Sequence, residues 1–166
     1  SGTPMTLDDE SWRGAFETVF LGSMRIARAA ANAMSSNPDE MSGTGGSLVF
    51  VLSTSAREVF TGLTTSNALR PALAMMVKDL ADELGPRGIR VNGLMPGRLA
   101  TDRMFAVDAR LGAPDMVRRR NEAAIPLGRY GEPSELGSVA AFLLSPAASY
   151  VSGSVVPVDG GMMRSF

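Results

Sequence analysis

Apolar residues recur at helical spacing in three stretches of the chain, at about residues 6–34, 65–84 and 133–144. This period predicts three helices with one apolar face each. We expect the first helix to begin at Thr6, because an acidic residue follows three positions later and the pair can bond the free amides of a first turn. We expect Pro71 to lie within the first turn of the second helix, since deeper in a helix it would break the backbone hydrogen bonding.

Three short runs between turn residues are apolar over most of their length, at residues 47–53, 88–95 and 155–158. Their lack of alternation indicates strands that are buried on both faces, as in a parallel sheet. The first run, the second helix and the second run together predict one strand–helix–strand unit, which is right-handed in nearly all known proteins. The pattern therefore predicts an α/β fold.

Two other stretches lack a simple period. Residues 35–46 are rich in Ser, Gly, Asn and Pro, and they are predicted to form a loop. Residues 101–124 are predicted to form an irregular helical excursion that is broken at residues 112–114, where Gly, Ala and Pro follow one another. The chain has no internal repeat and no interdomain linker, so we expect its 166 residues to form part of one domain.

Composition narrows the chemistry. The chain contains no cysteine and no histidine, which excludes disulfides, thiolate nucleophiles and histidine bases, and we expect no metal site. The formal net charge is −1 and residues 118–120, three arginines, are the only basic cluster, so no nucleic-acid partner is expected. No apolar run approaches the roughly 20 residues of a membrane span, and no secretory signal is visible. We expect no membrane partner and a cytoplasmic location.

Three blocks of sequence carry a likeness to a known family. They are residues 81–92 with Pro96, Gly97 and Thr101 after them, residues 126–133, and residues 149–153 with the Val-Asp-Gly-Gly of 158–161. In order and spacing they resemble the short-chain dehydrogenase/reductase family, and the likeness extends from about Thr6 to Gly161. The resemblance implies that residues 1–166 are the C-terminal portion of a single Rossmann-type domain, a doubly wound parallel sheet.

The resemblance also implies a function. Members of the family bind NAD or NADP and move a hydride between the nicotinamide and the carbon of a small alcohol or carbonyl substrate. Pro96, Gly97, Leu99 and Thr101 would then lie beside the nicotinamide ring and its amide, beyond the carboxyl end of a parallel strand, where such sheets hold ligands. Taken without the surrounding blocks, the Pro-Gly pair would indicate a simple turn. The two long helices match the family's usual subunit interface, so a homodimer or homotetramer is expected.

The catalytic positions depart from the family pattern. The family uses an asparagine, a serine, a tyrosine and a lysine, and these positions fall on Val19, Ser53, Ser66 and Arg70 of this chain. Only Ser53 matches. A serine hydroxyl is a far weaker acid than a tyrosine phenol, which titrates near roughly pH 10, and an arginine stays protonated. The resemblance therefore implies an atypical proton-transfer arrangement.

We take Ser53, Ser66 and Arg70 as the candidate catalytic residues. Ser53 could hydrogen-bond a substrate oxygen. Ser66 could instead be a helix cap. Arg70 could be a charge at the helix surface or against a loop, or a fixed cation that polarises a carbonyl or binds a carboxylate or phosphate.

The family's glycine-rich loop, which cradles the pyrophosphate between a strand and a helix, has no match. The Gly-Thr-Gly of residues 43–45 precedes a predicted strand rather than following one. We therefore expect the chain by itself to hold a dinucleotide weakly. Three functions stay open: an NAD(P)-dependent oxidoreductase with atypical catalytic residues, a non-catalytic binding or assembly subunit of the same fold, and a lyase or isomerase in which Ser53 and Arg70 stabilise an oxyanion.

Overall fold

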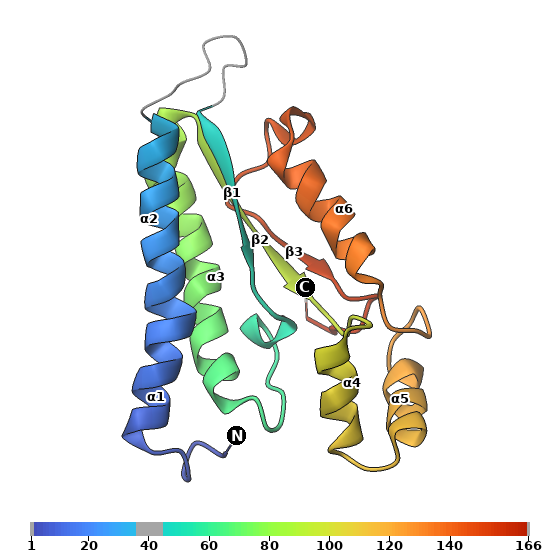
Figure 1. The fold of residues 1–166 in the computed structure, drawn as a ribbon. Coiled ribbons are helices and arrows are strands. Elements are labelled where there is room, and N and C mark those ends of the chain that lie inside the picture. The colour runs from blue at the N-terminus through green and yellow to red at the C-terminus, as the bar shows by residue number, and fades with distance from the viewer. Residues whose placement is uncertain (1, 36–44, 166) are drawn as a thin grey trace.

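The computed structural model describes residues 2–35 and 45–165 (Figure 1). Residues 36–44, which include most of the predicted loop and Gly43 and Thr44, lie outside the described part of the chain. In chain order the main elements are α1 (Asp9–Ala15), the π-helical segment η1 (Phe16–Leu21), α2 (Gly22–Ser35), β1 (Gly46–Val51), α3 (Thr64–Leu84), β2 (Ile89–Pro96), α4 (Asp102–Ala109), α5 (Pro114–Ala123), α6 (Pro133–Leu144) and β3 (Val155–Val158).

The three strands form one parallel sheet in the order β1-β2-β3. β1 pairs with β2 from Gly46 opposite Ile89 to Val51 opposite Leu94. β2 pairs with β3 from Gly93 opposite Val155 onward. The prediction of parallel strands at all three apolar runs is confirmed, and so is the helical excursion, which consists of α4 and α5 with a break between them.

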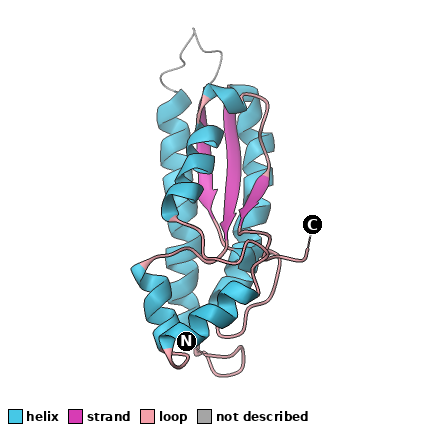
Figure 2. Ribbon diagram, turned by 90° about the vertical axis from the view of Figure 1, so that its right-hand side faces the viewer, coloured by secondary structure: helices cyan, strands magenta, loops and turns pink. Residues whose placement is uncertain are grey.

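Helices cover both faces of the sheet (Figure 2). α2 and α3 lie on one face, where α3 contacts β2 and α2 contacts β1, and α6 contacts all three strands from the other side. This three-layer arrangement confirms the predicted Rossmann-type, doubly wound α/β class. That residues 1–166 are the C-terminal portion of one such domain stays a prediction.

The core lies between β2 and α3. Seven of the eight residues of β2 are buried, because the strand has a neighbour at each edge and a helix on each face. α3 contacts β2, and its Leu73, Val77 and Leu80, at helical spacing, belong to the same buried cluster as Ile89, Val91 and Met95 of the strand.

Two polar residues are buried in β2 as well. Arg90 donates to the carbonyl oxygens of Leu143, Ser145 and Val151 at 2.7–3.3 Å. Asn92 donates to the carbonyl of Val151 at 2.8 Å. These two side chains therefore satisfy the backbone that connects α6 to β3.

Two details of the helix predictions are wrong. The first helix begins at Asp9, and it is the Asp8 carboxylate that accepts a bond from the amide of Ser11, at 2.8 Å; the hydroxyl of Thr6 bonds the amide of Thr3 instead. Pro71 lies in the interior of α3, seven residues beyond its first residue. The helix continues through the proline because burial of Leu69 and Leu73 on either side outweighs one lost backbone hydrogen bond.

Packing of α3 on the sheet predicts a measurable difference between two leucines. Leu73 is 1% exposed and Leu111 is 60% exposed. Leu73→Ala is expected to lower the free energy of unfolding by about 2–5 kcal/mol, because it leaves a cavity under β2. Leu111→Ala should change it by less than about 0.5 kcal/mol. Urea denaturation followed by circular dichroism measures both, and equal effects of the two variants would contradict this account of the core.

Candidate active site

Ser53 and Ser66 meet at the carboxyl end of β1 through a third serine. After β1 the chain turns into a short 3-10 helix (Thr54–Ala56), where the hydroxyl of Ser53 accepts a bond from the amide of Ser55 at 3.1 Å. The hydroxyl oxygens of Ser55 and Ser66 lie 2.8 Å apart. Ser55 thus joins the end of β1 to the start of α3, bonding Ser53 through its backbone amide and Ser66 through its hydroxyl.

The structure changes the interpretation of Ser66. The N-cap position of α3 is Leu63, so the prediction of Ser66 as a helix cap is wrong. Ser66 lies inside the first turn, where its hydroxyl faces the loop after β1. The sequence analysis missed Ser55; its only signal was a second serine two positions after Ser53.

Arg70 lies one helical turn after Ser66 on the same side of α3. Its Nη1 donates to the carbonyl oxygen of Val51, the last residue of β1, at 2.9 Å. Burial lowers the pKa of this guanidinium, which nonetheless stays charged at neutral pH. Within the described part of the chain, no Asp or Glu forms an ion pair with Arg70. Arg70 is therefore a partly desolvated cation at the carboxyl edge of the sheet, held there by a neutral acceptor.

The position predicted for the family's asparagine, Val19, contributes no polar group. Val19 belongs to η1 and packs against the apolar core. Of the four positions predicted from the resemblance, Ser53, Ser66 and Arg70 therefore gather at the end of β1, and Val19 packs in the core.

The turn after β2 lies at the same edge of the sheet, because β1 and β2 are parallel. Gly97 donates its amide to the carbonyl of Val158 at 3.0 Å. A Cβ on Gly97 would lie 2.7 Å from the Cβ of Asp159, so only glycine fits between the ends of β2 and β3. Leu99 forms an isolated bridge with Gly131. The hydroxyl of Thr101 caps α4 by accepting the amide of Met104 at 3.2 Å.

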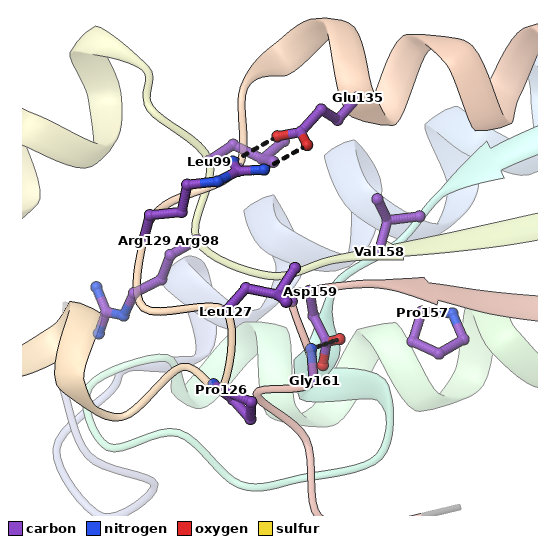
Figure 3. A pocket seen from close by; sticks show the side chains of 12 residues that line it. Arg98, Leu99, Pro126, Leu127, Arg129, Glu135, Pro157, Val158, Asp159 and Gly161 are labelled. Atoms are coloured by element: carbon purple, nitrogen blue, oxygen red, sulfur yellow. Dashed lines mark hydrogen bonds and ion pairs between the residues drawn. The ribbon is translucent and has the colours of Figure 1, made fainter.

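A pocket of about 530 Å³ opens beside this turn (Figure 3). Leu99 is the one residue of the seven predicted for the site that lines it. The sequence analysis did not single out the other lining residues, although several belong to the family-like block 126–133. They are Arg98, Pro126, Leu127, Arg129, Gly131, Glu135, Pro157, Val158, Asp159, Gly160 and Gly161.

An ion pair forms part of the pocket wall. Figure 3 shows the guanidinium of Arg129 against the carboxylate of Glu135, with Nη1 and Nη2 donating to separate oxygens at 2.8 and 2.7 Å. Glu135 also accepts the amide of Glu132 at 2.7 Å. The bond from Arg129, together with the amide of Glu132, lowers the pKa of Glu135 to about 2. The carboxylate thus ties the loop before α6 to the start of that helix.

Comparison with known proteins places the chain in a family. A family model described as "Enoyl-(Acyl carrier protein) reductase" matches residues 1–163. Protein FixR of Bradyrhizobium diazoefficiens is 35% identical over 161 residues, which are 96% of this chain and 52% of that protein. The 3-oxoacyl-[acyl-carrier-protein] reductase FabG of Vibrio cholerae is 30% identical over 95% of this chain and 60% of its own length.

Solved structures agree with this assignment. YwfH, an NADPH-dependent reductase involved in bacilysin biosynthesis, superposes with a TM-score of 0.91 at 26% identity, over 99% of this chain and 63% of that chain. A candidate NAD(P)-dependent gluconate 5-dehydrogenase of Beutenbergia cavernae, solved with NADP bound at low occupancy, gives 0.86 at 29% identity over 99% and 62%. The chain belongs to the short-chain dehydrogenase/reductase family, and it spans about half to three-fifths of the length of its relatives.

Two features are absent from the described residues. No helix in ranges 2–35 and 45–165 is long and apolar enough to cross a membrane. Within the same ranges, no three acidic side chains gather in a way that could hold a metal ion.

The Glu135 ion pair predicts a pH dependence. Its folded pKa is about 2, below the ordinary value of 4.5, so the carboxylate stabilises the fold above pH 4.5 and loses that contribution as the pH falls toward 2. The side-chain carboxyl carbon should titrate near pH 2 by NMR. Glu135→Gln should lower the melting temperature at pH 6, and the difference should shrink steadily below pH 4. A carboxyl titration midpoint near 4.5 would contradict the arrangement.

Proposed function

We propose that this chain supplies the nicotinamide-binding and substrate-binding part of an NAD(P)-dependent oxidoreductase that acts on a small alcohol or carbonyl compound. The observation that carries the proposal is that Ser53, Ser66, Arg70 and the turn at Pro96 and Gly97 all follow or face the carboxyl ends of β1 and β2, which lie side by side in one parallel sheet. Ligands of open α/β sheets bind at this edge. Family membership supports the reaction class.

Pro96, Gly97, Leu99 and Thr101 would hold the nicotinamide end of the cofactor. The geometry fits that role because the turn directly follows the buried central strand and is fixed by the bond from Gly97 to Val158. The hydroxyl of Thr101 already accepts an amide, which leaves its hydrogen free to donate. When bound, NAD or NADP supplies or accepts the hydride. Since no glycine-rich phosphate loop is found in the sequence, groups outside this chain would hold the pyrophosphate.

The serines and Arg70 would act on the substrate oxygen. In the reductive direction this oxygen gains a proton, and the net proton comes from solvent water. Ser66 can pass its own proton to the oxygen and regain one from water, directly or by way of Ser55, its hydrogen-bond partner, so that no serine alkoxide remains. Ser53 can donate a hydrogen bond to the same oxygen, and Arg70 supplies positive charge where negative charge develops. Arg70 does not lose its proton, so it acts through its field rather than as an acid.

One observation favours the second candidate, a non-catalytic binding or assembly subunit. The only hydrogen bond described for the guanidinium of Arg70 goes to the last carbonyl of β1. Such a bond is enough to explain an arginine at this position by structure alone. In that case the dimer or tetramer expected from the helix pair α2 and α3 would be the functional unit.

A titration with half-cofactors tests the nicotinamide assignment. Nicotinamide mononucleotide is expected to shift the backbone amide signals of Gly97, Leu99 and Thr101 in NMR spectra at millimolar concentration. Adenosine monophosphate serves as the control and should leave these three signals in place, because the adenine half has no binding loop in this chain. If neither NADH, NADPH nor the mononucleotide moves any amide of this turn, the oxidoreductase proposal fails.

Substitutions at the serine–arginine cluster test the catalytic assignment. Ser53→Ala and Arg70→Met are each expected to lower kcat/KM for carbonyl reduction by roughly 100-fold, the usual loss when a group that stabilises an oxyanion is removed. The assay should use the longest polypeptide that carries this chain, with NADPH or NADH and a panel of aldehydes and ketones.

Exposed residues of the same types provide the controls. Ser138→Ala and Arg28→Met should leave kcat/KM unchanged, since both side chains are exposed and lie in other helices. Unchanged turnover in Ser53→Ala and Arg70→Met as well would reject the assignment. Cofactor binding without turnover on any substrate would favour the non-catalytic subunit.

A further inference from the structure

A buried polar network holds α4 and α5 together. We call residues 102–124, which contain these two helices, the lid. The carboxylate of Asp108 in α4 accepts from the hydroxyl of Tyr130 at 2.7 Å and from the amide nitrogen of Asn121 in α5 at 3.1 Å. Asn121 also lies 3.0 Å from the Tyr130 hydroxyl. Asp108, Asn121 and Tyr130 thus bond one another pairwise in a closed triangle.

The burial of this triangle makes its bonds costly to lose. Asp108 and Tyr130 are each 2% exposed, and Asn121 is 8% exposed. A buried carboxylate that loses a donor keeps the cost of its desolvation, so each bond matters more here than at the surface. Burial raises the pKa of the Tyr130 hydroxyl, and its bond to Asp108 raises it further, so the phenol stays protonated and donates.

Two arginines enclose the triangle. The guanidinium of Arg118 in α5 lies 5.5 Å from the ring centres of both Phe105 in α4 and Tyr130. Arg98, which directly follows Gly97, lies 6.0 Å from the Tyr130 ring centre, and its Nη1 approaches the Asp108 carboxylate at 3.4 Å. In Figure 3 the side chain of Arg98 runs away from the Arg129–Glu135 pair. Arg98 therefore reaches from the turn after β2 into the lid.

The backbone at the base of the lid is paired as well. The carbonyl of Arg98 accepts from the amide of Gly131 at 3.0 Å, and the carbonyl of Gly131 accepts from the amide of Ala100 at 2.8 Å. This neck, residues 98–100 with Gly131, closes just below the triangle, since Tyr130 precedes Gly131. The lid is thus joined to the turn after β2 by this neck, and its two helices share a buried polar triangle with Tyr130.

We propose that Asp108, Asn121 and Tyr130 are positioning residues that make the two lid helices one rigid body, and that Arg98 links the position of this body to the turn at Pro96 and Gly97. The rigid body is a property of the chain alone. The link to catalysis rests on the proposed function, because it matters only if that turn holds a nicotinamide.

Hydrogen exchange of the protein tests the rigid body. Tyr130→Phe removes one hydroxyl, and the amides of α4 and α5 are expected to exchange roughly 10- to 100-fold faster while those of β2 keep their rates. The other tyrosine gives a matched control: Tyr150 is fully exposed, and Tyr150→Phe should change neither. If amide exchange accelerates equally in β2 and in the lid, the substitution destabilises the whole fold. If exchange does not accelerate at all, the triangle does not stabilise the lid helices. Either result overturns the proposal.

A double variant separates positioning from ordinary stability. Asp108→Asn alone is expected to speed lid exchange about as much as Tyr130→Phe. Because both act on one bonded unit, the double variant should exchange little faster than either single one. If the double variant accelerates exchange by the product of the two single effects, the residues act independently, and the assignment of a shared network is overturned.

Arg98→Met tests the link to the turn. In the unaltered protein, nicotinamide mononucleotide is expected to shift the side-chain amide signal of Asn121 together with the backbone signal of Gly97. In Arg98→Met the Gly97 shift should persist and the Asn121 shift should fall at least several-fold. Persistence of both shifts would overturn the link. Absence of both in the unaltered protein would overturn the proposed function and the link with it, while the exchange experiments would still decide the rigid body.

Discussion

The burial of β2 is the constraint from which the rest of the structure follows. This strand has a parallel neighbour at each edge and helices over both faces, and seven of its eight residues are buried. Its direction and depth are therefore fixed, and so is the place where it ends. The turn at Pro96 and Gly97 leaves the sheet at that point, packed so closely on Asp159 that no side chain fits at Gly97. The position of the candidate site is therefore set by the end of this strand.

Charge is distributed unequally around the site. At the end of β1, Arg70 is partly desolvated, and its hydrogen-bond partner within residues 2–35 and 45–165 is a neutral carbonyl, so its field remains available to a ligand. In the lid, the carboxylate of Asp108 is buried and accepts hydrogen bonds from Arg98, Asn121 and Tyr130, so its charge is neutralised by groups inside the protein. The first arrangement suits binding of an electron-rich group, whereas the second suits holding two helices in register. This contrast is the physical basis for assigning one to chemistry and the other to positioning.

Much of the fold could be predicted because its signals are local. Short runs that are apolar over most of their length indicated parallel strands, and helical spacing indicated α3 and α6; the structure has all of these elements. The resemblance singled out Ser53, Ser66 and Arg70, and the structure brings these three to one edge of the sheet. The errors came where a local rule competes with packing: Pro71 is tolerated inside α3 because its neighbours are buried, and Asp8 rather than Thr6 caps α1 because it lies next to the first turn.

The sequence by itself determined the α/β class and the order of its elements, since periodicity and motif spacing depend only on neighbours along the chain. Only the tertiary structure decided that Ser55 joins Ser53 to Ser66, that Arg70 has no acidic partner in the described part of the chain, and that Asp108 meets Tyr130. Each of these facts depends on how elements distant in sequence pack in space. Side-chain hydrogen bonds of this kind form where packing excludes water, and no local pattern records which groups will share that space.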